Sequence, residues 1–353
     1  VDPETNTYTT VANLDNSYSL SGQIPVFAGL SGINTVRAAR VMRLMGIEEL
    51  QQARDEAALN AMQAYFDVVY YTESVRLARE QRQKLYELGL KSAADVAEIE
   101  SQCASDDFLL TQQENNLALA KISLCEAMNY PSGSCPEIVA EIAVGTPAGA
   151  AAYGEVLAYA LEKHPKAQQA AYNVQQMRLK YSVAKGKYYP SVSVGGGYST
   201  NFFMSLDDRS LYAPFGSQLR DNRGYYFSAR LSIPIFGGLT KRTSVNRARN
   251  NWRIAELQRD ATLRTLQSEV AQAYQHMLGA GKEFVQASKK AEAARLAYEA
   301  VAGKYERGMV SALDLQTASD KLLQARAERI RTRLQYIIKT RLVEYYNGEP
   351  LIR

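Results

Sequence analysis

Residues 227–239 read FSARLSIPIFGGL, and residues 18–30 read YSLSGQIPVFAGL. The second proline, Pro234, lies 209 residues after the first, Pro25, and the two stretches align without a gap. In both, apolar and polar residues alternate, which is the period of a strand with one apolar face. Such a strand fits a half-buried soluble sheet, and its length of about ten residues also fits a membrane-spanning β-barrel. The stretch therefore predicts a duplicated strand and leaves its surroundings open.

The duplication continues beyond the strands. Residues 85–96 (LYELGLKSAADV) match residues 304–315 (KYERGMVSALDL). Two shorter matches lie between, in the same order: Ala39-Arg40 with Ala248-Arg249, and Ala64-Tyr65 with Ala273-Tyr274. Because four matches keep their order, we interpret the chain as two copies of one unit, each with a strand, a long helix, a tight turn and a second long helix.

A heptad pattern of apolar residues predicts the long helices. In the second copy it continues for more than forty residues without a proline. Its members are Leu263, Leu266, Val270, Ala273, Met277, Ala280, Phe284, Ala287, Ala291, Ala294, Tyr298, Val301 and Tyr305. A sustained seven-residue repeat indicates supercoiled helices. The returning helix carries one apolar row from Leu315 to Ala325 and another from Leu323 to Ile337, which predicts two neighbours for it.

The reversal between the two helices has its own sequence signals. Gly308 suits the left-handed position that ends a helix, and Ser311 with Asp314 three residues later fits a capping box. The first copy repeats this pattern over residues 89–95. Taken locally, these residues predict no more than a helical hairpin.

Composition excludes several classes of protein. The net charge is only +4, with 41 basic and 37 acidic residues interleaved, so nucleic-acid binding is not expected. Two histidines and three scattered cysteines do not form a typical metal site, and we expect neither metal nor cofactor. His164 and His276 have no partner for acid–base chemistry, so they are expected at the surface or in packing, and an enzyme is not expected. No apolar run is long enough for a membrane-spanning helix.

Residues 129–187 join the two copies. They are rich in proline and glycine at first and then predict short helices over 153–163 and 166–185. Cys125 and Cys135 flank a turn and could form a disulfide in an oxidising compartment, although three reduced thiols are equally compatible with the sequence.

Taken together, these features resemble the outer-membrane efflux protein family, the TolC-like channels. The resemblance covers nearly the whole chain. It rests on the strand end at 233–239 and its copy at 24–30, the Tyr-x-x-Gly-x-x-Ser-x-x-Asp turn at 305–314 and its copy at 86–95, and Ala160-Leu161-x-x-His164-Pro165 followed by residues 184–192. Each motif alone is loose, but the duplicated order is specific.

The resemblance implies a mainly α fold with a small β part. Long coiled-coil hairpins would form an α-barrel, and a trimer giving four strands per chain would form a transmembrane β-barrel. The expected parts are residues 1–128 (a partial strand and loop over 1–17, strand 18–28 and the hairpin turning at 89–92), an equatorial linker at 129–187, and residues 188–353 (strands 191–199 and 225–236, a loop over 200–224 and the hairpin turning at 308–311).

The resemblance also implies a function, a location and partners. The chain would be a trimeric exit duct in the outer membrane of a Gram-negative bacterium, extending into the periplasm and working with an adaptor protein and an inner-membrane transporter. Asp314, Tyr305 and Thr317 would lie at the periplasmic aperture. The adaptor would contact the hairpin tips at Gly89, Leu90, Ser92, Gly308, Met309 and Ser311. One member of the family has an Asp and an Arg where this sequence has Thr317 and Val310, so the usual salt links of the aperture are not expected.

Two features depart from the family pattern, and one other class of protein stays open. The first copy has only 24 residues before Pro25, and its Tyr65 to Gly89 spacing is 24 residues against 34 from Tyr274 to Gly308. We expect missing residues near 75–84 rather than unequal hairpins. The alternative is a soluble coiled-coil periplasmic adaptor or scaffold, although an adaptor carries one hairpin and this chain carries two.

Overall fold

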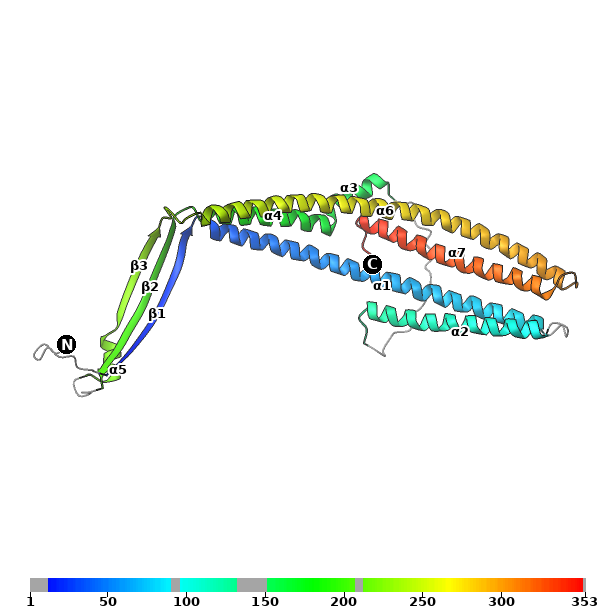
Figure 1. Cartoon of the computed structure of the whole chain (residues 1–353), viewed down its shortest axis with the longest axis horizontal. Helices are drawn as coiled ribbons and strands as arrows, with labels where there is room; N and C mark the ends of the chain where they lie inside the picture. The colour runs from blue at the N-terminus through cyan, green and yellow to red at the C-terminus, as the bar shows by residue number, and fades with distance from the viewer. Residues whose placement is uncertain (1–11, 90–95, 132–150, 207–211, 352–353) are drawn as a thin grey trace, which may run out of the picture. The chain divides into compact units, whose positions relative to one another are not determined.

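The computed structural model describes residues 12–89, 96–131, 151–206 and 212–351 (Figure 1). The elements are β1 (Asn13–Ala28), α1 (Ser31–Gly89), α2 (Val96–Ala127), α3 (Tyr153–Lys163), α4 (Pro165–Gly186), β2 (Ser191–Ser205), α5 (Phe215–Asp221), β3 (Gly224–Ser232), α6 (Thr240–Tyr305) and α7 (Ala312–Tyr346). They form two compact units. The strand unit comprises the chain up to Arg43 and Asn173–Glu256, and the hairpin unit comprises Leu44–Tyr172 and Leu257–Arg353. Each unit takes residues from both copies of the repeat.

The strand unit contains an antiparallel sheet in the order β1-β2-β3. β1 and β2 pair from Asn13 with Ser205 to Ala28 with Ser191. The predicted strand at 18–28 is therefore present but starts earlier, because residues 13–17 belong to it and not to a preceding loop.

Proline decides where the outer strands bend or end. Pro25 has no N–H to donate, and the register of β1 shifts between Pro25 and Phe27, so the chain accommodates it at a bulge. β3 instead ends at Ser232, two residues before Pro234. The predicted strand at 225–236 was thus too long at its carboxyl end.

The predicted loop at 200–224 was only partly right. β2 continues to Ser205, and α5 packs on its end. Thr200 Oγ1 donates to the carbonyl oxygen of Leu219 at 2.7 Å, and the Gln218 side chain bonds both the N–H and the carbonyl of Phe203. No periodic pattern in the sequence predicts these hydrogen bonds between side chains and backbone.

Among the described residues no second layer covers the sheet, and α5 packs only at one end of it. Every residue of β3 is exposed, and nearly all residues of β1 are exposed as well. Large apolar side chains stay in contact with solvent, with Leu20 76% and Phe227 81% exposed. The described residues contain three strands rather than the four that the family resemblance implied, and residues 1–11 lie outside them.

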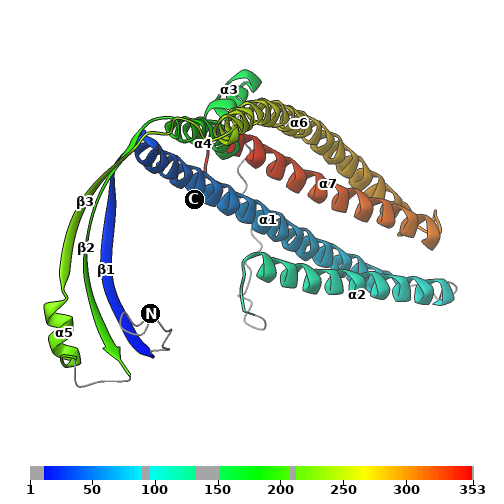
Figure 2. The same ribbon diagram turned by 60° about the vertical axis from the view of Figure 1, so that its left-hand side comes forward.

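Backbone contacts between glycines join the strands to the helices. Figures 1 and 2 show the starts of α1 and α6 and the end of α4 gathered at one end of the sheet. Gly29 has φ +59°, and a Cβ placed there would lie 2.1 Å from the carbonyl oxygen of Gly186. Gly238, its repeat equivalent, has φ +60° but open space around it.

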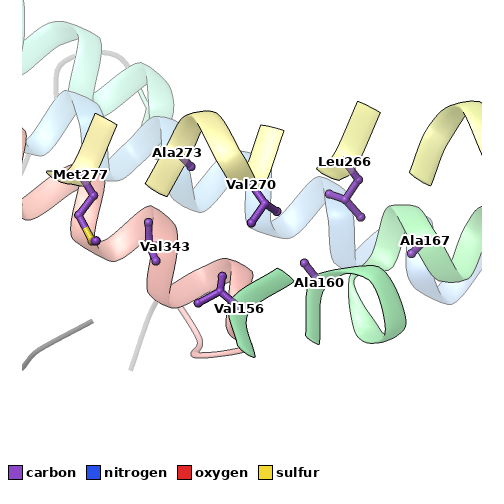
Figure 3. Packing of buried hydrophobic residues seen from close by; sticks show 8 residues of the cluster. All are labelled: Val156, Ala160, Ala167, Leu266, Val270, Ala273, Met277 and Val343. Carbon is purple, nitrogen blue, oxygen red and sulfur yellow. The ribbon is translucent and has the colours of Figure 1, made fainter. Parts of the chain in front are cut away.

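The core of the hairpin unit follows the predicted heptad pattern. Leu266, Val270, Ala273 and Met277 of α6 are buried against α3, the start of α4, and α7 (Figure 3). The complete cluster consists of Val156, Ala160, Ala167, Leu266, Val270, Ala273, Met277 and Val343. Further along the hairpin, Phe284 stacks on Tyr336 at 6.4 Å between ring centroids. The heptad interpretation is confirmed.

The other hairpin has smaller cores. Val68 packs with Ala120 and Leu124, and Val75 packs with Ala78 and Leu110. α1 is one uninterrupted helix of 59 residues, shorter than the 66 residues of α6, and it passes through residues 75–84 without a break. The shorter Tyr65 to Gly89 spacing therefore corresponds to a shorter helix α1, and α1 has no break where missing residues were expected.

Replacing Gly29 should test the glycine contact. We expect Gly29→Ala to lower the free energy of unfolding by about 2–4 kcal/mol, because it combines a left-handed backbone with a collision at Gly186. Gly238→Ala should cost only about 1–2 kcal/mol, since the backbone strain is its sole cost. Thermal unfolding of the purified variants measures both, and equal losses would contradict the contact.

Candidate functional site

The tip of the α6–α7 hairpin is held by backbone hydrogen bonds. The N–H of Met309 donates to the carbonyl of Lys304 at 3.0 Å, and that of Gly308 donates to the carbonyl of Tyr305 at 2.8 Å. This is the Schellman arrangement, and it requires the left-handed conformation that Gly308 adopts with φ +70°. The glycine therefore has the conformational role that the sequence predicted.

The next helix begins with a capping box. Ser311 Oγ accepts from the N–H of Asp314 at 3.2 Å, and an Asp314 carboxylate oxygen accepts from the N–H of Ser311 at 3.1 Å. The hydroxyl of Ser311 also donates to that carboxylate at 2.7 Å. These bonds hold the pKa of Asp314 below its ordinary value, so the exposed tip presents a carboxylate that stays charged in mildly acidic solution.

The other residues predicted at the tips are only partly connected. Thr317 Oγ1 donates to the carbonyl of Leu313, and no hydrogen bond joins Asp314 to Tyr305 or Thr317 within the described chain. The Met309 side chain is 63% exposed. At the other tip, Gly89 ends α1, and the predicted contacts Leu90 and Ser92 lie outside the described residues.

The hairpin unit also contains a buried polar cluster that the sequence had not indicated. The Gln81 amide on α1 donates to one carboxylate oxygen of Asp106 on α2 at 3.2 Å and to one of Asp320 on α7 at 3.0 Å. Gln102 donates to the same oxygen of Asp106 at 3.1 Å, and Gln316 donates to Asp320 at 2.9 Å. A single amide group therefore links three helices that belong to two different hairpins.

This cluster has too few donors. Asp106 is only 4% exposed, and its second carboxylate oxygen finds no donor among the described residues; the same holds for the amide oxygen of Gln81. Burial raises the pKa of Asp106, and the carboxylates of Asp320 and Asp107 add to the rise, while the bonds from Gln102 and Gln81 oppose it. One signal was readable: Asp106 precedes the buried Leu110 by one helical turn, on the same face.

His164 has a packing role. It is 5% exposed, stacks on Tyr346 at 5.5 Å, and its Nδ1 accepts from the N–H of Lys166 at 3.2 Å. Burial, assisted by the positive charge of Lys166, lowers its pKa to about 4, against the weaker opposite effect of Glu269 and Asp55. The imidazole is therefore neutral in its packed position.

The cysteines support part of the disulfide hypothesis. Cys125 is disulfide-bonded, and Cys103 is a half-buried thiol. The proposed partner, Cys135, lies outside the described residues, so this pairing stays a prediction.

Comparison with known families identifies the chain. The profile of the family described as "Outer membrane efflux protein" matches residues 156–344, more than half of the sequence. The chain belongs to the outer membrane efflux protein family. Members of this family are channels and not enzymes, as the sequence predicted. Its members are located in the outer membrane of Gram-negative bacteria and extend into the periplasm.

Solved structures share the fold of this efflux family member at low sequence identity. The CusC channel superposes with a TM-score of 0.76 at 14% identity, over 96% of this chain and 83% of CusC. The open-state MtrE outer membrane channel of Neisseria gonorrhoeae gives 0.72 at 17% identity, over 98% of this chain and 81% of MtrE. VceC, an outer membrane protein of Vibrio cholerae, gives 0.70 at 15% identity, over 96% and 87%. No curated protein sequence matches.

These structures confirm the predicted fold class, mainly helical with a small sheet. Over the described ranges, no three or more His, Cys, Asp and Glu side chains are grouped to hold a metal ion. No helix in the described part of the chain has the length and apolarity needed to cross a membrane.

The buried cluster predicts an unusual response to loss of charge. Asp106→Asn should raise the free energy of unfolding by about 1 kcal/mol at neutral pH, because it removes a buried charge and supplies amide donors. Because the pKa of Asp106 is raised, the folded state binds the proton of this carboxyl more tightly than the unfolded state does. The free-energy cost of burying the charged carboxylate therefore develops as the pH rises from about 4, and it is largest above the pKa of the folded state.

Thermal unfolding of wild type and Asp106→Asn, from pH 7.5 down to 4, tests this expectation. The stability gained by Asp106→Asn over wild type should become smaller as the pH falls. Asp107→Asn is the matched control, since its half-exposed carboxylate pairs with Arg82 at 2.7 Å and its loss should be neutral or slightly destabilising. Destabilisation by Asp106→Asn at neutral pH would show that the charged form is needed.

Proposed function

We propose that three copies of the chain form the exit duct of a tripartite efflux system. In this proposal the sheets of three chains complete one β-barrel in the outer membrane, and the hairpins form a tunnel through the periplasm. A periplasmic adaptor joins the tunnel to an inner-membrane transporter, which supplies the substrate. The observation that carries the proposal is the uncovered sheet of this efflux family member.

The sheet supports an assembly because it is incomplete by itself. Within the described residues, β1 and β3 each pair on one side only, so each leaves one edge of N–H and C=O groups unbonded. In a bilayer no water is available to satisfy those groups, and only a closed barrel removes the edges. Alternate apolar residues such as Leu20, Ile24 and Phe227 are exposed and suit contact with lipid.

The hairpins also have apolar surface to spare. On α7, Leu315, Leu322 and Ala325 of the first predicted row are buried. In the second row Leu334 is buried, while Leu323, Ala327, Ile330 and Ile337 are half-exposed. A neighbouring chain could cover the second row, which fits the sequence prediction of two neighbours per helix.

The soluble adaptor or scaffold is the less favoured alternative. A soluble protein rarely exposes a continuous sheet of large apolar residues. The match to the efflux family over residues 156–344 also favours the channel.

Asp314 should control the periplasmic aperture of the trimer. Three such carboxylates near the symmetry axis would attract cations and narrow the path. Asp314→Asn should raise single-channel conductance in a planar bilayer and weaken block by a trivalent cation roughly tenfold, because it removes the charge and keeps an oxygen that accepts from Ser311.

Ser311→Ala is the control for the cap. It removes the hydroxyl and costs the helix about 1 kcal/mol, but it leaves the carboxylate in place. Both variants should first be shown to form detergent-extracted, heat-sensitive trimers. Unchanged conductance and unchanged block in Asp314→Asn trimers would overturn the aperture proposal, and a soluble monomeric wild type would overturn the channel.

Met309 is the sharpest probe of the proposed adaptor contact. Its side chain is exposed at the tip, and unlike Gly308 it needs no left-handed backbone. Met309→Arg should reduce export to near the level of a strain without the channel, measured as cellular accumulation of an efflux substrate. Leu296→Arg, at a 53% exposed position of α6 before the tip, should retain export. Full export by Met309→Arg would contradict the contact.

A further inference from the structure

Basic residues gather where the helices of the strand unit meet the sheet. They are Arg37, Arg40 and Arg43 near the start of α1, Arg178, Lys180, Lys185 and Lys187 near the end of α4, and Lys241, Arg242, Arg247, Arg249 and Arg253 near the start of α6. No acidic residue occurs in 16–47, 163–206 or 222–255. The whole chain is nearly balanced in charge, so this basic collar is a local feature.

The collar differs from an ordinary charged helix surface. Arg37, Arg40 and Arg249 are exposed, and none of them has an ion pair among the described residues. Further along α6, Arg295 shows the usual pattern, because it pairs with Glu292 at 2.7 Å and with Glu299 at 2.5 Å. Basic side chains without an ion pair, gathered in this collar, indicate a negatively charged partner from outside the chain.

An apolar hollow of about 550 Å³ adjoins the collar at the end of β1. Val26 lines it from the strand, Ile33 and Val36 line it from the first turns of α1, and Arg37 and Arg40 come next along the helix. Val26, Ile33 and Val36 are each more than half exposed. The surface therefore changes from apolar to cationic within about two helical turns.

The apolar part of this surface continues the apolar face of β1. Leu20 and Ile24 lie on the same face of β1 and are exposed, and the hollow adjoins Val26, in the bulge that follows. Helical side chains tilt toward the amino terminus, which for α1 is the end joined to the strand. Long arginine side chains can also reach toward a membrane surface while their stems stay on apolar groups. Both effects bring the guanidinium groups toward the level at which the strands leave the bilayer.

Aromatic residues lie near the basic residues of this unit. Tyr188 and Tyr189 are exposed between α4 and β2, and Tyr181 stacks on Trp252 with 5.8 Å between ring centroids. The Arg178 guanidinium lies 6.0 Å above the Trp252 ring. Tyrosine and tryptophan with neighbouring cations are typical of the boundary between hydrocarbon and headgroups.

We propose that the basic collar binds anionic phospholipid headgroups of the periplasmic leaflet. Arg37 and Arg40 would hold the phosphate, an acyl chain would occupy the hollow beside Val26 and Ile33, and Arg249 provides the repeat-related position on α6. Guanidinium groups suit this ligand because they bind phosphate oxygens in pairs. The site rests on the sheet spanning the outer membrane, as proposed above, and does not depend on which substrate is exported.

The test uses the purified full-length protein in a neutral detergent. Short-chain phosphatidylglycerol should raise the thermal unfolding midpoint, whereas phosphatidylcholine and inorganic phosphate should not, because they lack either the net charge or the acyl chain. In the double variant Arg37→Gln/Arg40→Gln, about thirtyfold more phosphatidylglycerol should be needed for the same shift. The control Arg329→Gln/Arg331→Gln removes two exposed charges from α7 and should respond as wild type.

Several results would overturn the site. They are an unchanged phosphatidylglycerol response in the Arg37/Arg40 double variant, an equal response to phosphatidylcholine, and an equal response to inorganic phosphate. If the double variant changes the ion selectivity of the channel in a bilayer and leaves lipid binding intact, the collar lines the tunnel instead. If that variant does not fold, native mass spectrometry of the wild type in an equimolar mixture of the two lipids decides, and lack of phosphatidylglycerol enrichment refutes the proposal.

Discussion

Backbone hydrogen bonding at the sheet edges is the constraint on which the rest of the molecule depends. Within the described residues β2 is paired on both sides, while β1 and β3 are each paired on one side only. The large apolar side chains of these two outer strands are exposed. In water such a sheet would aggregate, and in lipid it would be unstable until its edges were closed. The long hairpins, with their small alanine-rich cores, are likewise suited to neighbours on more than one side.

The duplicated strand and the heptad pattern made most of this fold predictable. Leu266, Val270 and Met277 were expected in the seam and are buried, because a period of seven over many turns leaves a helix little choice of buried face. Strand ends were less predictable. Two prolines in equivalent positions have different outcomes: Pro25 sits at a bulge and Pro234 lies beyond the end of its strand. The difference depends on pairing partners that local sequence does not specify.

The same contrast applies to the site. The turn at Gly308 and the capping box of Ser311 and Asp314 could be predicted, because their interactions join residues three to five positions apart. The cluster of Gln81, Asp106 and Asp320 could not, since the amide and the carboxylate of Asp320 are 239 residues apart in sequence. Asp106 before a buried leucine indicated only that a charge faced inward, not what it would meet.

The contact between Gly29 and Gly186 affects how motion can spread through the strand unit. Two backbones meet there without side chains between them, so no rotamer change can absorb a displacement. In the hairpin unit, by contrast, the seam contains many alanine methyl groups, which present shallow ridges for sliding. We therefore expect the backbone contact between Gly29 and Gly186 to yield less to a displacement than the alanine seam. In the proposed trimer, such a rigid junction would help the barrel to keep a constant bore.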